Sequence, residues 1–167
     1  MNRRAAMKKF LVAIIAAMLA LTAVFAAGCE SPSPGMVTLD TWFFTSGVRN
    51  NLITVTSQRE DVSFVLTTEK GVFWSPEEHD YCKQVTLSAD ETATWQPLRS
   101  TTEIELDFVE IIVKENDKII GYAVIKITQR EGTMDHAAEV LKASYFSSPV
   151  TQEYVEGVIK KIKDKNS

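Results

Sequence analysis

The chain has 167 residues, of which 45% are hydrophobic, and its 18 Lys and Arg against 22 Asp and Glu give a net charge of −4. The first 28 residues hold four of the basic residues and no acidic one, so the remainder carries 14 basic against 22 acidic residues, a net charge of −8. A surface of that sign repels phosphate backbones, which argues against binding of nucleic acid. About 139 residues after position 28 suffice for one domain and are too few for a two-lobed solute receptor.

The N-terminal segment has the composition of an export signal. Arg3, Arg4, Lys8 and Lys9 precede Phe10–Ala27, an apolar run in which Thr22 is the only polar residue. A basic start, an apolar middle and small residues at the end are typical of a secretory signal, whereas a membrane-spanning helix is usually somewhat longer. We therefore expect residues 1–28 to direct export, with an uncleaved membrane anchor as an alternative.

The segment ends in Ala26-Ala27-Gly28-Cys29, which resembles the lipobox of bacterial lipoproteins. The resemblance implies a diacylglyceryl group on the Cys29 thiol, cleavage before Cys29, and localisation to the cell membrane as a lipid-anchored protein on its extracytoplasmic face. An ordinary secretory signal cut after Ala27 or Gly28 is the competing interpretation. Residues 29–36, which are rich in Pro and Ser, are predicted to form a tether between lipid and domain.

Residues 37–129 are predicted to form a β-sandwich, because short β-branched and aromatic runs alternate there with turn residues. The clearest hairpin joins Asp107–Lys114 to Lys118–Ile127 through Glu115-Asn116-Asp117, where Asn and Asp tolerate a left-handed backbone. Ile119–Ile125 is apolar at both odd and even positions, so both faces of this strand should be covered. The other expected strands are Leu52–Ser57, Val62–Thr67, Val85–Ser88 and Thr92–Trp95.

Residues 130–167 are predicted to be a helical extension of the same domain. A short helix is expected over Met134–Leu141, and a longer one over Val150–Lys163 with Pro149 in its first turn. The longer helix has one apolar stripe, which we expect to cover the second face of the Ile119–Ile125 strand. Its members are Tyr154, Val155, Val158, Ile159 and Ile162.

The stretch Asp61–Ile127 resembles bacterial immunoglobulin-like domains in its order of strands and turns, including a turn over Glu69–Phe73 and the pair Thr94-Trp95. The resemblance implies an adhesion, spacer or ligand-binding module. The expected fold class is mainly β: an antiparallel immunoglobulin-like sandwich with C-terminal helices packed on one sheet, α+β overall.

Catalytic or metal-binding chemistry has one candidate region. Carboxylates, an imidazole and a thiol gather in Glu77–Cys82, and Asp135-His136 adds a second imidazole, so an envelope hydrolase or metal-binding protein using His79, Asp80 and His136 is an alternative. The spacings of zinc, calcium and serine-hydrolase motifs are missing. We therefore expect a noncatalytic protein without a cofactor, in which Ser75–Glu78 is a capped loop and Cys82 is buried; a reactive or intermolecularly bonded thiol is the alternative.

The candidate recognition surface consists of Trp74, Glu77, Glu78, His79 and Asp80, because Trp74 is the aromatic residue expected nearest the surface and adjoins this acidic loop. Its ligand is expected to be a protein or a glycan. The leading functional hypothesis is a membrane-tethered binding or scaffold module at the cell envelope, and an accessory subunit of a membrane complex is another alternative.

Overall fold

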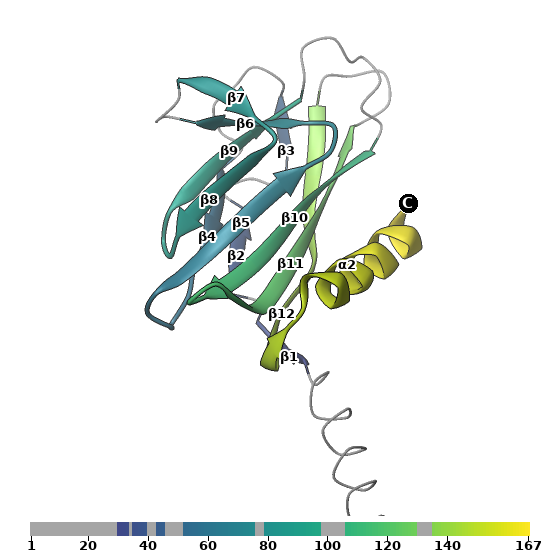
Figure 1. Cartoon of the computed structure of the whole chain (residues 1–167). Coiled ribbons are helices and arrows are strands. Elements are labelled where there is room, and N and C mark those ends of the chain that lie inside the picture. Colours follow the sequence, from purple (N-terminus) through teal and green to yellow (C-terminus); the bar gives the residue numbers. More distant parts are fainter. Residues whose placement is uncertain are drawn as a thin grey trace, which may run out of the picture.

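The computed structural model describes residues 30–33, 35–39, 43–45, 52–75, 79–97, 106–129 and 135–167 (Figure 1). The predicted signal segment, Cys29, Glu77 and Glu78 lie outside the described residues. The described part is mainly β, as predicted, with two antiparallel sheets and one C-terminal helix.

The larger sheet has the strand order β1-β12-β11-β10-β5-β8, and β3 also pairs with β12. Its strands are β1 (Glu30–Pro32), β3 (Phe43–Thr45), β5 (Val62–Thr68), β8 (Gln84–Ser88), β10 (Leu106–Glu115), β11 (Lys118–Gln129) and β12 (Asp135–Val150). The smaller sheet has the order β2-β4-β9-β6-β7. Its strands are β2 (Val37–Leu39), β4 (Leu52–Val55), β6 (Val72–Ser75), β7 (Asp80–Cys82) and β9 (Thr92–Gln96).

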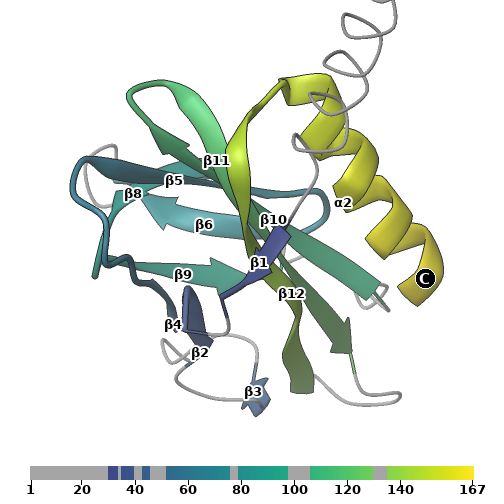
Figure 2. The ribbon, with the colours of Figure 1, turned by 90° about the horizontal axis from the view of Figure 1, so that it is seen from below.

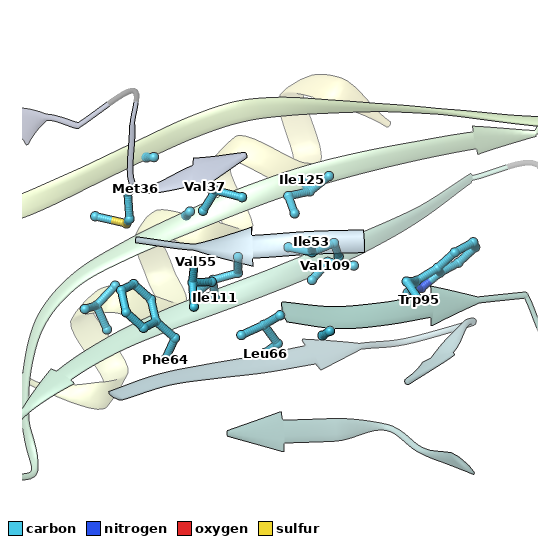
Figure 3. Close-up of a cluster of buried hydrophobic side chains, with 14 of the residues drawn as sticks. Met36, Val37, Ile53, Val55, Phe64, Leu66, Trp95, Val109, Ile111 and Ile125 are labelled. Carbon is cyan, nitrogen blue, oxygen red and sulfur yellow. The ribbon is translucent and has the colours of Figure 1, made fainter. Parts of the chain in front are cut away.

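The two sheets share one hydrophobic core. Along β5, buried and half-buried residues alternate, so Phe64 and Leu66 point inward from the larger sheet. Ile53, Val55 and Trp95 of the smaller sheet belong to the same buried cluster, as the close-up shows (Figure 3). This alternation with period two is the pattern that predicted the strands, and the shared core of the two sheets is compatible with a β-sandwich.

The predicted hairpin between β10 and β11 is confirmed. Glu115 pairs with Lys118, leaving Asn116 and Asp117 as a two-residue turn. Both turn residues have positive φ, 49° and 62° respectively. A two-residue turn of this type follows the right-handed twist of the flanking strands, and Asn and Asp reach it at lower cost than bulkier residues.

Helix α2 (Gln152–Asn166) covers the second face of β11, as predicted, but Tyr154 of the predicted stripe is 42% exposed and lies outside the cluster. Ile120, Ala123 and Ile125 face the sandwich core, whereas Ile119, Tyr122 and Val124 belong to a second cluster with Val155 and Ile159 of the helix. Figure 2 shows α2 and the smaller sheet on opposite sides of the larger sheet. The Thr151 hydroxyl caps the helix by accepting from the Tyr154 amide at 3.3 Å, so the prediction that Pro149 lies in its first turn is wrong.

The helix predicted over Met134–Leu141 is wrong over its described residues, because Asp135–Val150 forms β12. β12 pairs with β11 over nearly its whole length, and His136 and Ala138 are buried at alternating positions. The helix-forming residues around Ala137 and Glu139 favour a helix locally, but pairing with a central strand overrides that weak preference. The described part of the extension, residues 135–167, is therefore about half strand and half helix.

The tether predicted for residues 29–36 is wrong over Glu30–Pro32, which form β1 at the edge of β12. The amide of Ser33 continues this contact by donating to the carbonyl of Ala143, and Met36 is buried in the sandwich core. Pro32 fits here because an edge strand does not need every backbone N–H. The turn predicted over Glu69–Phe73 is likewise shorter, because Val72 and Phe73 begin β6.

Candidate functional site

The hairpin formed by β6 and β7 carries the candidate recognition residues. Its register places Phe73 opposite Cys82, Trp74 opposite Tyr81, and Ser75 opposite Asp80. Because side chains alternate along a strand, Phe73 and Cys82 turn toward the core while Trp74 and Tyr81 share the other face. The Cys82 thiol donates to the Phe73 carbonyl at 3.7 Å, but Cys82 is half-buried, so it is less enclosed than the buried cysteine that the sequence predicted.

Trp74 and Tyr81 form an aromatic pair on this outward face. Their ring centroids are 5.2 Å apart and their planes meet at 67°. Tyr81 is 51% exposed and Trp74 is half-buried, whereas Trp95 is fully buried. Neither member of the pair belongs to either hydrophobic cluster. The pair is therefore free to contact a ligand without opening the core.

Two polar candidates adjoin the aromatic pair. His79 is exposed and has a φ of 54°, a turn conformation, and Asp80 is exposed directly before Tyr81. The Asp80 carboxylate accepts from the Tyr81 amide at 2.7 Å. The hairpin thus carries Trp74, His79 and Asp80, but Asp80 is opposite Ser75, so its side chain is on the other face from the Trp74–Tyr81 pair. Glu77 and Glu78, together with most of the predicted capped loop, fall outside the described residues. Sequence reasoning missed Tyr81, because its partnership with Trp74 depends on the hairpin register.

A buried carboxylate fixes the turn that leads into β6. Asp107, which is 2% exposed, accepts from the Thr68 hydroxyl at 2.5 Å and from the amides of Lys70 and Gly71 at 3.1 and 2.8 Å. Trp95 completes the group, since its indole N–H donates to the Thr68 hydroxyl at 3.0 Å. A buried carboxylate is tolerated where its oxygens accept several hydrogen bonds, and here those bonds hold the turn on the larger sheet.

Lys83 holds the same turn from the other side. Its ammonium group donates to the carbonyls of Glu69, Lys70 and Gly71 at 2.7, 3.1 and 2.7 Å. Lys83 directly follows β7, so these bonds connect the end of that strand to the entry of β6. The hairpin is consequently fixed at its base before any ligand arrives, which lowers the entropy cost of binding at its face.

The residues proposed for a hydrolytic or metal site do not share one environment. His136 is 2% exposed in β12, with its ring 5.7 Å from that of Trp95, whereas His79 and Asp80 are on the hairpin surface. Within the described ranges, no group of three or more His, Cys, Asp or Glu side chains is arranged to hold a metal ion.

No protein-family model, curated protein or solved structure matches the chain. Among the helices that the structure describes, none has both the length and the apolar character needed to cross a bilayer.

Proposed function

We propose that the protein is a bacterial lipoprotein, held on the extracytoplasmic face of the cell membrane by acyl chains on Cys29, and that it acts as a noncatalytic binding or scaffold module. The lipobox sequence and the apolar segment before it support the anchor. Two or more acyl chains hold a protein durably on a membrane, whereas one chain is marginal. Because β1 begins at Glu30, the residue after Cys29, the folded domain stands directly at the bilayer surface.

The main observation in favour of a binding role is the Trp74–Tyr81 pair, which lies on a hairpin fixed at its base by hydrogen bonds. Aromatic side chains with a polar handle supply much of the contact energy at binding surfaces, and they suit the faces of sugars as well as proteins. Exposed His79, two residues before Tyr81, adds a hydrogen-bonding group on the same hairpin. The hairpin and β1 lie at opposite ends of the domain, so an anchored molecule presents this face away from the membrane (Figure 1).

We also propose that the sandwich is immunoglobulin-like. Its two antiparallel sheets enclose a shared core, and the chain passes from the larger to the smaller sheet between β8 and β9. A fully buried Trp95 in that core supports the assignment. Helix α2 is an addition to such a module.

The anchor is tested by metabolic labelling with a radioactive fatty acid. The Cys29→Ser variant is expected to lose the label and to accumulate as a precursor of higher apparent mass. Cys82→Ser is the matched control, because it removes the other cysteine and should keep both label and processing. A Cys29→Ser protein that is still labelled and cut contradicts the proposed anchor.

The binding face is tested by photo-crosslinking in intact cells. A photoreactive phenylalanine analogue replaces Tyr81 in one variant and exposed Lys118, on the β10–β11 turn, in the control. We expect adducts with an envelope protein or glycan at position 81 that are absent at position 118. These adducts should disappear when Trp74→Ala is added. The same adduct pattern at both positions contradicts a dedicated recognition face.

A further inference from the structure

The lysines of α2 divide between two flanks of the helix. On one flank, the Lys163 ammonium lies 2.6 Å from Glu110 Oε1 and 3.7 Å from Glu69 Oε2. Burial, the largest single effect, lowers the pKa of Lys163, but the hydrogen bond and charge of Glu110 together with Glu69 raise that pKa overall. Lys160 pairs with Asp164 at 2.7 Å along the helix. These two lysines are engaged by acidic side chains of the domain itself.

The opposite flank is basic and faces β12. Exposed Lys161 and Lys165, four residues apart on the helix, line a shallow groove with exposed Lys142 of β12. Leu141 and Ile162 supply its apolar lining, and Asn166 also borders it. A second groove continues along the helix and shares Lys161; its other lining residues are Thr151, Glu153, Tyr154, Gly157 and Val158. We call the surface formed by these two grooves the α2–β12 flank.

Charge on the α2–β12 flank is opposite to that of the molecule as a whole. Three lysines line it, and Glu153, at the N-terminal end of the helix, is the acidic residue among its described lining. The chain after position 28 carries a net charge of −8. An anionic surface is therefore attracted to this flank and repelled by most of the rest of the domain.

The flank is also next to the predicted lipid attachment point. Glu30, which directly follows Cys29 in the chain, pairs with Phe146 of β12. The Phe146 ring lies 5.8 Å from the ring of Tyr154, which is 42% exposed at the start of α2. Figure 1 shows β1, the end of β12 and the start of α2 at the same, lower end of the domain. Tyrosine is a residue that favours the membrane–water interface, where its ring and hydroxyl meet different surroundings.

We propose that the α2–β12 flank docks on the anionic phospholipid headgroups of the membrane that holds the Cys29 acyl chains, an inference that rests on the proposed lipid anchor. Lys142, Lys161 and Lys165 supply the attraction, and Tyr154 enters the interface beside the anchor. The contact fixes the orientation of the domain. The β6–β7 hairpin belongs to the sheet on the far side of the molecule from α2, so it faces outward in this orientation.

The test uses the full mature protein, purified from the bacterial membrane and reconstituted into vesicles. Mass spectrometry first establishes whether Cys29 carries lipid. Lysine labelling by a water-soluble amine reagent is then compared between vesicles of phosphatidylcholine and vesicles that also contain phosphatidylglycerol. We expect Lys161 and Lys165 to be protected only in the anionic vesicles, and exposed Lys70, in the turn before β6, to be labelled equally in both. Salt at 1 M should abolish the protection, because it shortens the screening length to about 3 Å.

A double charge-reversal variant tests whether the charges of the flank lysines cause the docking. Each lysine near an anionic bilayer is worth about a fivefold gain in binding, so Lys161→Glu with Lys165→Glu should lower docking by more than about 25-fold. Protection of Lys142, the reporter, should then be lost. Lys70→Glu combined with Gln84→Glu and Thr86→Glu, at exposed positions on the opposite edge of the larger sheet, also changes the net charge by −4 and should leave Lys142 protected.

Equal labelling of Lys161 in both vesicle types, on protein that carries lipid at Cys29, overturns the docking proposal. Protection in native membrane fragments but not in phosphatidylglycerol vesicles also overturns it, in favour of a protein partner on this flank. Absence of lipid on Cys29 instead refutes the anchor, and the two failures are thereby distinguished.

Discussion

Two side chains of α2 are fully buried against the larger sheet, and replacing one of them by a smaller residue should weaken the whole fold. Val155 and Ile159 are the buried residues of the helix, and Ile159 is 2% exposed. Ile159 belongs to the cluster that includes Tyr122 and Phe146 on the opposing strands. Ile159→Ala leaves a cavity there and should lower the free energy of unfolding by about 2 to 5 kcal/mol. That is a large part of a total stability of roughly 5 to 15 kcal/mol.

Urea unfolding of the domain, followed by tryptophan fluorescence, measures this loss. With a denaturant slope of about 2 kcal/mol per M, the midpoint of Ile159→Ala should fall by about 1 to 2.5 M. Ile162→Ala is the matched control, because the same substitution is made one turn later at a half-buried position, and its midpoint should fall less. An unchanged midpoint for Ile159→Ala would refute the conclusion that α2 is part of the fold.

Deletion of residues 152–167 extends the same reasoning. It uncovers the apolar surface of Tyr122, Val124 and Phe146, which α2 covers in the intact domain. Exposed apolar patches of this kind promote association, so the truncated domain should unfold at much lower urea concentration or aggregate. A truncated domain that keeps its midpoint would instead make α2 a free interaction helix.

Three further predictions follow from polar and backbone contacts. Asp107→Ala removes the acceptor of three hydrogen bonds in a buried site and should cost about 3 kcal/mol or more in urea unfolding; an unchanged midpoint would show that these bonds do not support the turn. Gly71→Ala should destabilise the domain, because its new Cβ would lie 2.1 Å from Trp95 Nε1. Gly157→Ala should instead stabilise α2 by about 0.5 to 1 kcal/mol, because no atom lies within 4 Å of the new Cβ. The melting temperature should fall in the first variant and rise in the second. The pKa of Lys163 is raised above its ordinary value of 10.5, so the charged lysine should stabilise the fold fully below pH 10.5 and lose this effect as pH rises through the folded-state pKa. The difference in urea midpoint between wild type and Lys163→Gln should therefore be constant from pH 7 to 9 and become smaller near pH 11.

The hairpin and the helix could be predicted because their local signals agree with their final packing. Asn116 and Asp117 are residue types that accept positive φ, and a run rich in β-branched residues flanks them on each side. In α2, Val155 and Ile159 are four residues apart on one stripe, and the stripe implies a covered partner face. The strand Ile119–Ile125 supplied that face through its apolar residues at both parities.

β1 and β12 could not be predicted because tertiary pairing decides their conformation. Glu30–Pro32 has a composition typical of a linker, and it becomes a strand only because β12 offers an edge at Ser144–Phe146. β12 contains helix-forming residues around Ala137 and Glu139, yet it lies in register with the most buried strand of the sheet. Backbone hydrogen bonds to such a strand outweigh intrinsic preferences of a few tenths of a kcal/mol per residue.

The residues of the candidate site could largely be predicted from the sequence, but which of them share one face could not. A Trp beside carboxylates and an imidazole pointed to the region of Trp74, His79 and Asp80. Tyr81 entered only through the register that sets it opposite Trp74, and a shift of one residue would place it on the core side instead. Asp107 and Lys83, which fix that register from the base of the hairpin, give no local sign of their role, because their partners are up to 39 residues away. The proposed recognition face therefore depends on the fold, and the proposal predicts that variants at the base of the hairpin weaken binding by shifting the hairpin, although those residues touch no ligand.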